Sequence, residues 1–143
     1  MTRLLIGLAL GLALAAAFTH MPRAATAVNL DALARDVDNG SDHIPAGRLA
    51  VWLNEPKPGL RIIDLRSDSE YTASHIPHAE HMTLTQLRHA GFRNDETIVL
   101  YSAGGGHAAQ GWFFLRESGL EHVYSLKGGL DEWQARRPWR GSC

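Results

Sequence analysis

Short apolar runs alternate along most of this chain with longer segments of helical spacing, and this alternation restricts the possible architecture. Runs at residues 60–64, 96–101 and 121–126 are typical of strands buried inside a parallel sheet. A further short strand is expected around residues 81–83. Strands that alternate with helices form one parallel sheet, whose two faces the helices cover. The pattern therefore predicts an α/β fold, a parallel-stranded sheet with helices on both faces.

Apolar spacing, capping residues and closing glycines locate the helices. Asn29 is the expected N-cap of the first helix, and Ser67 followed by Glu70 has the form of a capping box. Gly91 and Gly119 are expected to end two later helices, because glycine readily adopts the left-handed conformation that closes them. The predicted helices cover residues 28–37, 45–54, 67–74, 83–91, 107–119 and 128–137.

The beginning of the chain differs from the rest, because an uncharged apolar run at residues 4–18 follows Arg3. This run is short for a membrane span, which needs about 20 apolar residues, and it suits a secretory signal. Residues 25–27 have the A-x-A form of a cleavage site, and residues 15–17 offer an earlier one. We therefore expect an exported protein. It would be periplasmic after cleavage, or anchored by an uncleaved segment and facing the periplasm or the extracellular side.

Charge and length limit the partners and the number of domains. Cleavage after Ala27 would remove Arg3 and Arg23 and leave 12 basic and 15 acidic residues. This mild charge, without a basic stripe, argues against a nucleic-acid partner, and contact with a membrane is expected only through an uncleaved N-terminal segment. The predicted parts are a signal peptide or anchor (1–27), a helix and linker (28–43), one domain (44–137) and a tail (138–143).

Two stretches at the predicted carboxyl edge of the sheet carry a family resemblance. The first, IIDLRSDSEYTASHIPHAEHM, contains a strand that ends Asp-x-Arg, then Glu-Tyr and His-Ile-Pro. The second, TIVLYSAGGGHAAQGWFFLRESGLEHVYSLKGGLDEW, contains a strand, a glycine-rich loop, a helix, another strand and Gly-Gly-x-x-x-Trp. In order and spacing these stretches resemble the rhodanese-like family over about residues 44–133. The resemblance implies the rhodanese-like fold.

The resemblance also implies which loop is the functional one. Sulfurtransferases of the family carry a cysteine at the first position of this loop, which takes up a sulfane sulfur as a persulfide. Ser102 occupies that position here, and His107 stands where an arginine or similar group often closes the loop. A serine hydroxyl has no accessible ionised form and stores no sulfur. We therefore expect a catalytically inactive domain that needs no cofactor.

The glycines of the loop favour a binding role. They would let consecutive amides converge at the start of a helix, where anions bind without a charged side chain. The predicted ligand is a small oxyanion or a partner protein, and Asp64 and Arg66 are expected to pair and support the loop. A tight turn that binds nothing is the alternative. The predicted loop residues are Ser102, Ala103, Gly104, Gly105, Gly106 and His107.

His107 at the start of a helix is expected to be mostly neutral at about pH 7, because the helix dipole disfavours the imidazolium there. Anion binding should then strengthen as the pH falls towards about 6. Two enzymatic alternatives stay open. One is a sulfurtransferase that uses Cys143, the single cysteine, and the other is a hydrolase triad of Ser102, His107 and Asp64.

His75, His78 and His81 recur at every third position with Glu80 beside them, a spacing that metal ligands can have. Pro77 prevents a regular helix, however, and residues three apart in an extended chain face opposite sides. We therefore predict no metal site.

Overall fold

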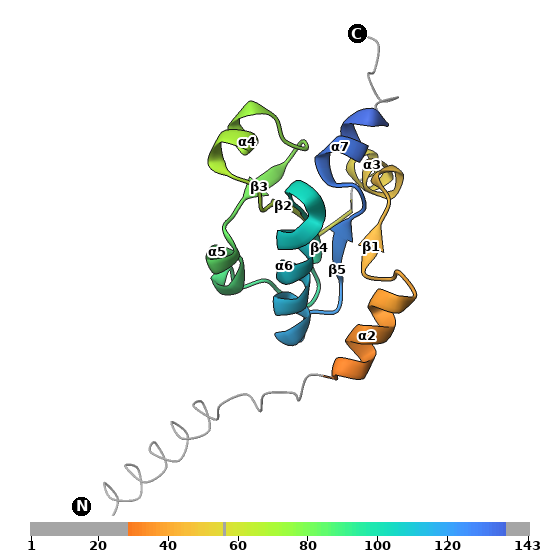
Figure 1. Cartoon of the computed structure of the whole chain (residues 1–143). Helices are drawn as coiled ribbons and strands as arrows, with labels where there is room; N and C mark the ends of the chain where they lie inside the picture. Colours follow the sequence, from red (N-terminus) through yellow and green to blue (C-terminus); the bar gives the residue numbers. More distant parts are fainter. Residues whose placement is uncertain (1–28, 56, 137–143) are drawn as a thin grey trace, which may run out of the picture.

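The computed structural model describes residues 29–55 and 57–136, and they fold around one parallel sheet (Figure 1). The sheet has five strands in the order β1-β5-β4-β2-β3, and every neighbouring pair is parallel. This confirms the predicted α/β class with a parallel-stranded sheet. The strands are β1 (His43–Ile44), β2 (Leu60–Asp64), β3 (Ala79–His81), β4 (Thr97–Tyr101) and β5 (Val123–Leu126).

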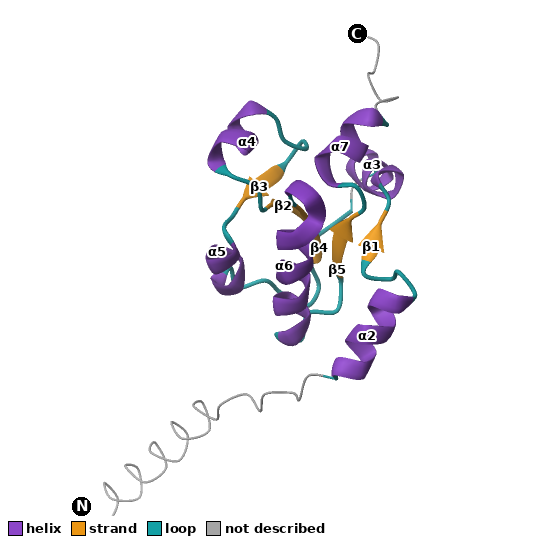
Figure 2. Ribbon diagram, in the orientation of Figure 1, coloured by secondary structure: helices purple, strands orange, loops and turns teal. Residues whose placement is uncertain are grey.

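Helices lie on both faces of this sheet, as Figure 2 shows. One face is covered by α2, α5 and α6, which contribute Leu33, Leu87 and Trp112 to a shared apolar cluster. The opposite face is covered by α3 and α7, which contribute Leu49 and Trp133. The helices are α2 (Leu30–Asp38), α3 (Ala46–Asn54), α4 (Asp68–Ala73), α5 (Leu84–His89), α6 (Gly106–Glu117) and α7 (Gly129–Ala135), with a 3-10 turn, η1 (Ala103–Gly105), before α6.

Strand β4 lies at the centre of the core, and its burial explains why its sequence is an apolar run. All five of its residues are buried, and they alternate between the two clusters: Ile98 and Leu100 pack under α6, while Val99 and Tyr101 face α3 and α7. A strand covered on both faces has no solvent side, so it tolerates apolar residues at every position.

Capping groups fix several helix starts. The Asn29 side chain accepts a hydrogen bond from the Ala32 amide at 3.0 Å, which confirms its predicted role. Ser67 and Glu70 form the predicted capping box at α4, and Thr83 with Gln86 forms a second one at α5. Each box satisfies amides that the first helical turn leaves unpaired.

Two strands differ from the expectation. β3 occupies Ala79–His81 rather than residues around 81–83, because Thr83 is used as the N-cap of α5. β1 was not predicted, since two residues are too few to show an alternating pattern. It pairs with β5, so that His43 lies opposite Ser125 at the edge of the sheet.

Helix α2 packs on the same body as the rest. Leu33 is buried against the cluster beneath α6, and Asp36 forms an ion pair with Arg116 of α6 at 2.7 Å. No helix in residues 29–55 and 57–136 is long and apolar enough to cross a membrane. The predicted signal or anchor and the tail with Cys143 lie outside the described residues.

Candidate functional site

A pocket of about 390 Å³ lies where β4 and β5 end. Parallel strands bring their carboxyl ends to one edge of the sheet, and ligands of such folds bind there. One wall is the segment after β4, and the opposite wall is the turn that leads from β5 into α7. The lining residues are His43, Arg66, Glu70, Ser102, Ala103, Gly104, Gly105, Ala108, Ser125, Leu126, Lys127, Gly128, Gly129, Leu130 and Asp131.

The two walls approach each other closely at Gly129. A Cβ atom there would stand 3.0 Å from the carbonyl oxygen of Ser102, and the residue has a φ of 54°. Gly128 is more restricted still, because a Cβ atom would lie 2.4 Å from the Cβ of Glu132. Glycine at 129 therefore lets the α7 turn close against the loop after β4, and glycine at 128 avoids a clash with Glu132 of the same helix.

Ser102 begins this loop and is 4% exposed. Its Oγ accepts a hydrogen bond from the amide of Ala108 in the first turn of α6, at 3.1 Å. Within the described ranges, no histidine or carboxylate hydrogen-bonds to this hydroxyl. The triad that the sequence left open thus lacks its base contact, and the hydroxyl instead satisfies an amide in the first turn of α6.

The loop backbone explains two of the three glycines. Gly104 and Gly105 have φ values of 65° and 78°, in the left-handed region that favours glycine. Gly106 has a φ of −60° and already belongs to α6, so its backbone would suit any residue. Ser102, Ala103, Gly104 and Gly105 line the pocket, whereas Gly106 does not.

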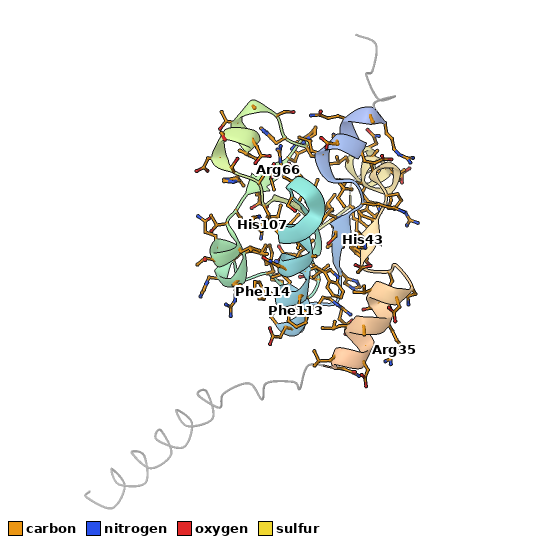
Figure 3. The ribbon with its side chains drawn as sticks, viewed as in Figure 1. Arg35, His43, Arg66, His107, Phe113 and Phe114 are labelled. Atoms are coloured by element: carbon orange, nitrogen blue, oxygen red, sulfur yellow. The ribbon has the colours of Figure 1, made fainter. Side chains whose placement is uncertain are left out.

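His107 does not face the pocket. It is the second residue of α6, its side chain is exposed, and it is absent from the lining. Figure 3 shows His107 on one side of α6 and His43 on the other. The structure therefore separates His107 from the pocket whose anion affinity it was expected to control.

Asp64 and Arg66 form the buried pair that the sequence suggested. The guanidinium Nη2 donates to Oδ2 of Asp64 at 2.6 Å and Nε donates to Oδ1 at 3.0 Å, with side chains 8% and 0% exposed. Nη2 also donates to the carbonyl oxygen of Ser74 at 2.6 Å. These hydrogen bonds to Asp64 raise the pKa of Arg66. The pair joins the end of β2 to the turn after α4 and leaves little net charge for a ligand.

Tyr101 lies beside this pair and is itself buried. Its hydroxyl accepts a hydrogen bond from the Ile76 amide at 3.2 Å, and the Arg66 guanidinium lies 5.5 Å from its ring centroid. Burial raises the pKa of the Tyr101 phenol well above its usual range, so the hydroxyl stays protonated at physiological pH. The Arg66 side chain of the pair thus lies over an uncharged phenol ring whose hydroxyl is hydrogen-bonded.

The site is built from an Asp-x-Arg strand end, a glycine-rich loop and a Gly-Gly turn into the last helix. This order of parts agrees with a comparison to known families. The family described as rhodanese-like domain matches residues 46–136. The chain belongs to the rhodanese-like domain family. This confirms the resemblance that the two sequence stretches indicated.

Relatives of this rhodanese-like domain include sulfurtransferases. It is 29% identical to the thiosulfate sulfurtransferase GlpE of Coxiella burnetii over 92 residues, which are 63% of this chain and 86% of the relative. It is 37% identical to the uncharacterized protein YqhL of Bacillus subtilis over 78 residues, 51% of this chain, and it spans only 60% of that relative. Among solved structures, the rhodanese-like domain of the Anabaena sp. Alr3790 protein superposes with a TM-score of 0.58 at 30% identity, over 71% of this chain and 87% of that one.

Several lining residues of this rhodanese-like domain were missed by the sequence analysis. Lys127 follows β5, is exposed, and forms no ion pair within the described part of the chain. Glu70 lines the pocket through α4, and hydrogen bonds from Ser67 lower its pKa. His43 reaches the pocket from β1. Position after a strand could have indicated Lys127, but no pattern distinguishes His43, because its strand is so short.

Two of the three spaced histidines contact the same aromatic ring, that of Tyr71. His75 and His81 stack on Tyr71, at 4.2 and 5.0 Å between ring centroids, and His78 has a φ of 63° in the turn between them. No group of three or more His, Cys, Asp or Glu side chains in residues 29–55 and 57–136 is placed to hold a metal ion.

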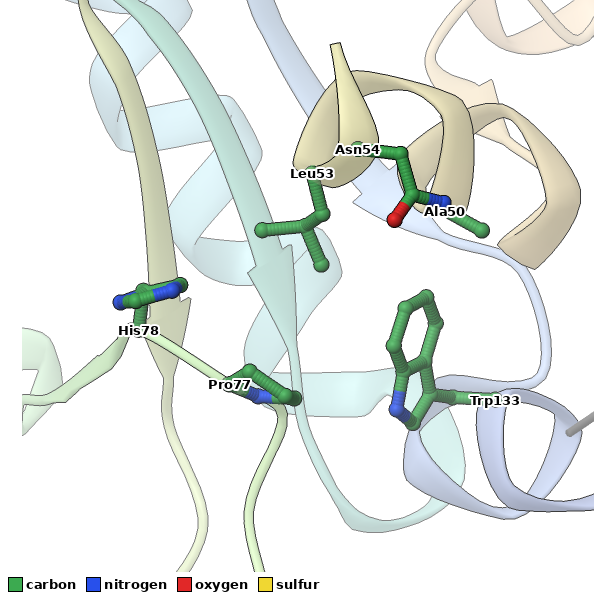
Figure 4. Close-up of a pocket in the computed structure, with 6 residues that line it drawn as sticks. All are labelled: Ala50, Leu53, Asn54, Pro77, His78 and Trp133. Atoms are coloured by element: carbon green, nitrogen blue, oxygen red, sulfur yellow. The ribbon is translucent and has the colours of Figure 1, made fainter. Parts of the chain in front are cut away.

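A smaller cavity of about 110 Å³ lies between α3 and α7, on the face of the sheet that these two helices cover (Figure 4). Trp133 from α7 and Leu53 from α3 give it apolar walls. It contains no side chain from the loop after β4. Its lining residues are Ala50, Leu53, Asn54, Pro77, His78 and Trp133.

Proposed function

We propose that this rhodanese-like domain binds a small oxyanion in the pocket at Ser102 and does not transfer sulfur through that loop. The observation that carries the proposal is the Ser102 hydroxyl itself. It stands at the start of the loop and accepts the Ala108 amide. An alcohol held in this way retains the capping contact but supplies no thiolate for persulfide formation.

The size and donors of the pocket support an oxyanion as its ligand. About 390 Å³ accommodates a small ion with part of its hydration shell. The loop after β4 leads into α6, a helix of 12 residues, and backbone amides at such a start attract negative charge. Lys127 adds a cation that no described carboxylate neutralises through an ion pair. Thiosulfate is a suitable first probe, because GlpE relatives are named as thiosulfate sulfurtransferases.

We further propose that the domain acts after export. Residues 1–27 have the charged start, apolar centre and small residues of a secretory signal. A periplasmic or membrane-anchored binding module would meet small oxyanions directly. A partner protein that docks at the rim of the same loop is the other ligand that the site would suit, and it would compete with the ion.

Isothermal titration of the purified protein with thiosulfate and with sulfate tests the binding. We expect saturable binding of both ions and a loss of affinity of about fivefold or more in Lys127→Gln, because one nearby cation is removed. Lys57→Gln is the matched control, since Lys57 lies over the ring of Trp52 and does not line the pocket. Equal loss in both variants, or no binding by the wild type, would contradict the proposal.

A thiosulfate–cyanide assay tests the second half of the proposal. The wild type should form no thiocyanate above the uncatalysed rate. Catalysed turnover that persists in Ser102→Ala and disappears in Cys143→Ala would instead support the sulfurtransferase alternative, with the terminal thiol as carrier. Turnover that disappears in Ser102→Ala would show that the hydroxyl itself takes part in a reaction.

A further inference from the structure

Asp42 is a buried carboxylate at the start of β1, beside the pocket. The residue is 6% exposed, and its Oδ1 has no aligned hydrogen-bond donor among the described residues. Its carbonyl oxygen accepts the Ser125 amide at 2.8 Å, which fixes its position against β5. A buried carboxylate without a donor is costly unless a positive charge lies close by.

The neighbouring residue supplies the charge. Nδ1 of His43 lies 2.7 Å from Asp42 Oδ1, and no other cationic side chain in the described part of the chain comes within 4.0 Å of Asp42. The geometry of this contact is not that of an aligned hydrogen bond. The His43 ring and the Asp42 carboxylate therefore attract each other as an ion pair only when the ring is protonated.

The same ring also faces the pocket. His43 lines it, and its side chain is 46% exposed although Nδ1 contacts the buried carboxylate. Within residues 29–55 and 57–136, Nε2 of His43 has no hydrogen-bond partner. An imidazolium donates from both nitrogens, so Nε2 is available to an anion while Nδ1 faces Asp42.

His43 is the only histidine among the described residues that line the pocket, and the other charged lining residues are of different types. Arg66 is paired with Asp64, and Lys127 is the other basic side chain of the lining. Glu70 from α4 and Asp131 from α7 are the acidic lining residues. Ser125, which lies opposite His43 in the sheet, carries no charge. Protonation of His43 would therefore change the net charge of the lining by one.

We infer that His43, held by the buried carboxylate of Asp42, is a binding residue that couples oxyanion binding to the uptake of one proton. This inference rests on the proposed oxyanion site and assigns its pH dependence to His43 rather than His107. An anion stabilises the imidazolium, and the imidazolium stabilises the anion, so the two equilibria are linked. Because imidazole changes charge between about pH 5 and 8, affinity should rise as the pH falls through that range.

The test is calorimetric titration of thiosulfate at about pH 6 and about pH 8, in pairs of buffers with different ionisation heats. We expect the wild type to bind roughly tenfold more weakly at the higher pH and to take up a proton on binding. His43→Gln should bind weakly at both pH values without proton uptake. His43→Lys should bind at both values with little pH dependence, because its charge is permanent over this range.

His107→Gln is the matched control, because it removes an imidazole that is exposed and does not line the pocket. It should behave as the wild type. Proton uptake that survives in His43→Gln but is lost in His107→Gln would overturn the inference while the oxyanion site stands. Absence of thiosulfate and sulfate binding by the wild type at both pH values would overturn the site and the inference together.

Discussion

The Ser102 hydroxyl and the Ala108 amide are joined by a hydrogen bond of 3.1 Å that spans the whole loop between β4 and α6. It ties the end of the central strand to the first turn of the helix that packs across the sheet. Ser102 thus has a structural role in this chain. Its removal can therefore be measured as stability as well as function.

Ser102→Ala should lower the free energy of unfolding by about 1 kcal/mol, because the buried Ala108 amide loses its acceptor. Urea denaturation of both proteins measures the difference. Gln110→Ala, on the exposed side of the same helix, is the control and should change stability by less than about 0.5 kcal/mol. An unchanged midpoint for Ser102→Ala would mean that water replaces the hydroxyl at no cost.

Ser102→Cys should become able to accept sulfur. A thiol at the start of α6 is favoured as the thiolate by the helix amides. The thiolate would attack the outer sulfur of thiosulfate, forming a persulfide while sulfite leaves. Mass spectrometry after incubation with thiosulfate should show a gain of one sulfur atom that a reductant removes. Ser102→Ala treated identically is the control, and an unmodified Ser102→Cys would show that the pocket does not present the donor to this position.

Removing one member of the Asp64–Arg66 pair should be costly, because the remaining charge stays buried. Arg66→Met and Asp64→Asn are each expected to lower the free energy of unfolding by about 3–5 kcal/mol. The double variant should lose clearly less than the sum, as neither charge is then left alone. Arg93→Met breaks a comparable but fully exposed pair with Asp95 and should have no measurable effect. Additive losses in the double variant would argue against direct coupling.

Tyr101→Phe tests the buried phenol. The Ile76 amide loses its acceptor, so stability at neutral pH should fall by about 1–3 kcal/mol. Burial raises the pKa of Tyr101 in the folded state above its unfolded value near 10, so the folded protein holds this proton longer. Wild-type stability should therefore decline as the pH rises above about 10, and Tyr101→Phe should show a shallower decline. Parallel denaturation curves at neutral and alkaline pH give both numbers, and equal slopes would contradict the assignment.

Gly111→Ala should destabilise the protein by about 1–3 kcal/mol, because α6 packs tightly on the sheet at this point. An added Cβ would stand 2.8 Å from a methyl group of Leu87 and 3.1 Å from one of Leu100. Gly106→Ala is the matched control on the same helix. It has a helical φ of −60° and open space around it, so it should be neutral or slightly stabilising. Thermal unfolding of both variants makes the comparison, and a stable Gly111→Ala would require the helix to shift outward.

Local patterns in the sequence were reliable where one feature was enough to specify a structure. The run at β4 predicted a buried strand, because its central residues, Ile98, Val99 and Leu100, are all apolar. The spacing of Ser67 and Glu70 predicted a helix start, since the capping box is made within one turn. The Asp64–Arg66 pair was also predictable, because its members are two residues apart at the end of a strand.

The same local patterns did not predict which residues far apart in the sequence lie together in the pocket. His107 is the histidine nearest to Ser102 in sequence, yet its place in the first turn of α6 turns it away from the pocket. His43 is far from Ser102 in sequence, yet the pairing of β1 with β5 brings it to the lining. Sequence proximity pointed to His107, whereas the pocket lining contains His43, because the direction of a side chain depends on the element that carries it.

The sequence by itself determined the α/β class and the family, since each is written in residue types at short spacing, and its resemblance to sulfurtransferases predicts that an alcohol stands at their cysteine position. Only the tertiary structure decided which charges surround that alcohol. Arg66 and Lys127 follow the carboxyl ends of β2 and β5, which parallel pairing brings to one edge, and the pairing of β1 with β5 adds His43 to the same lining. Burial of Asp42 beside His43 is likewise a product of packing, because the energy of a carboxylate depends on the water that the fold removes.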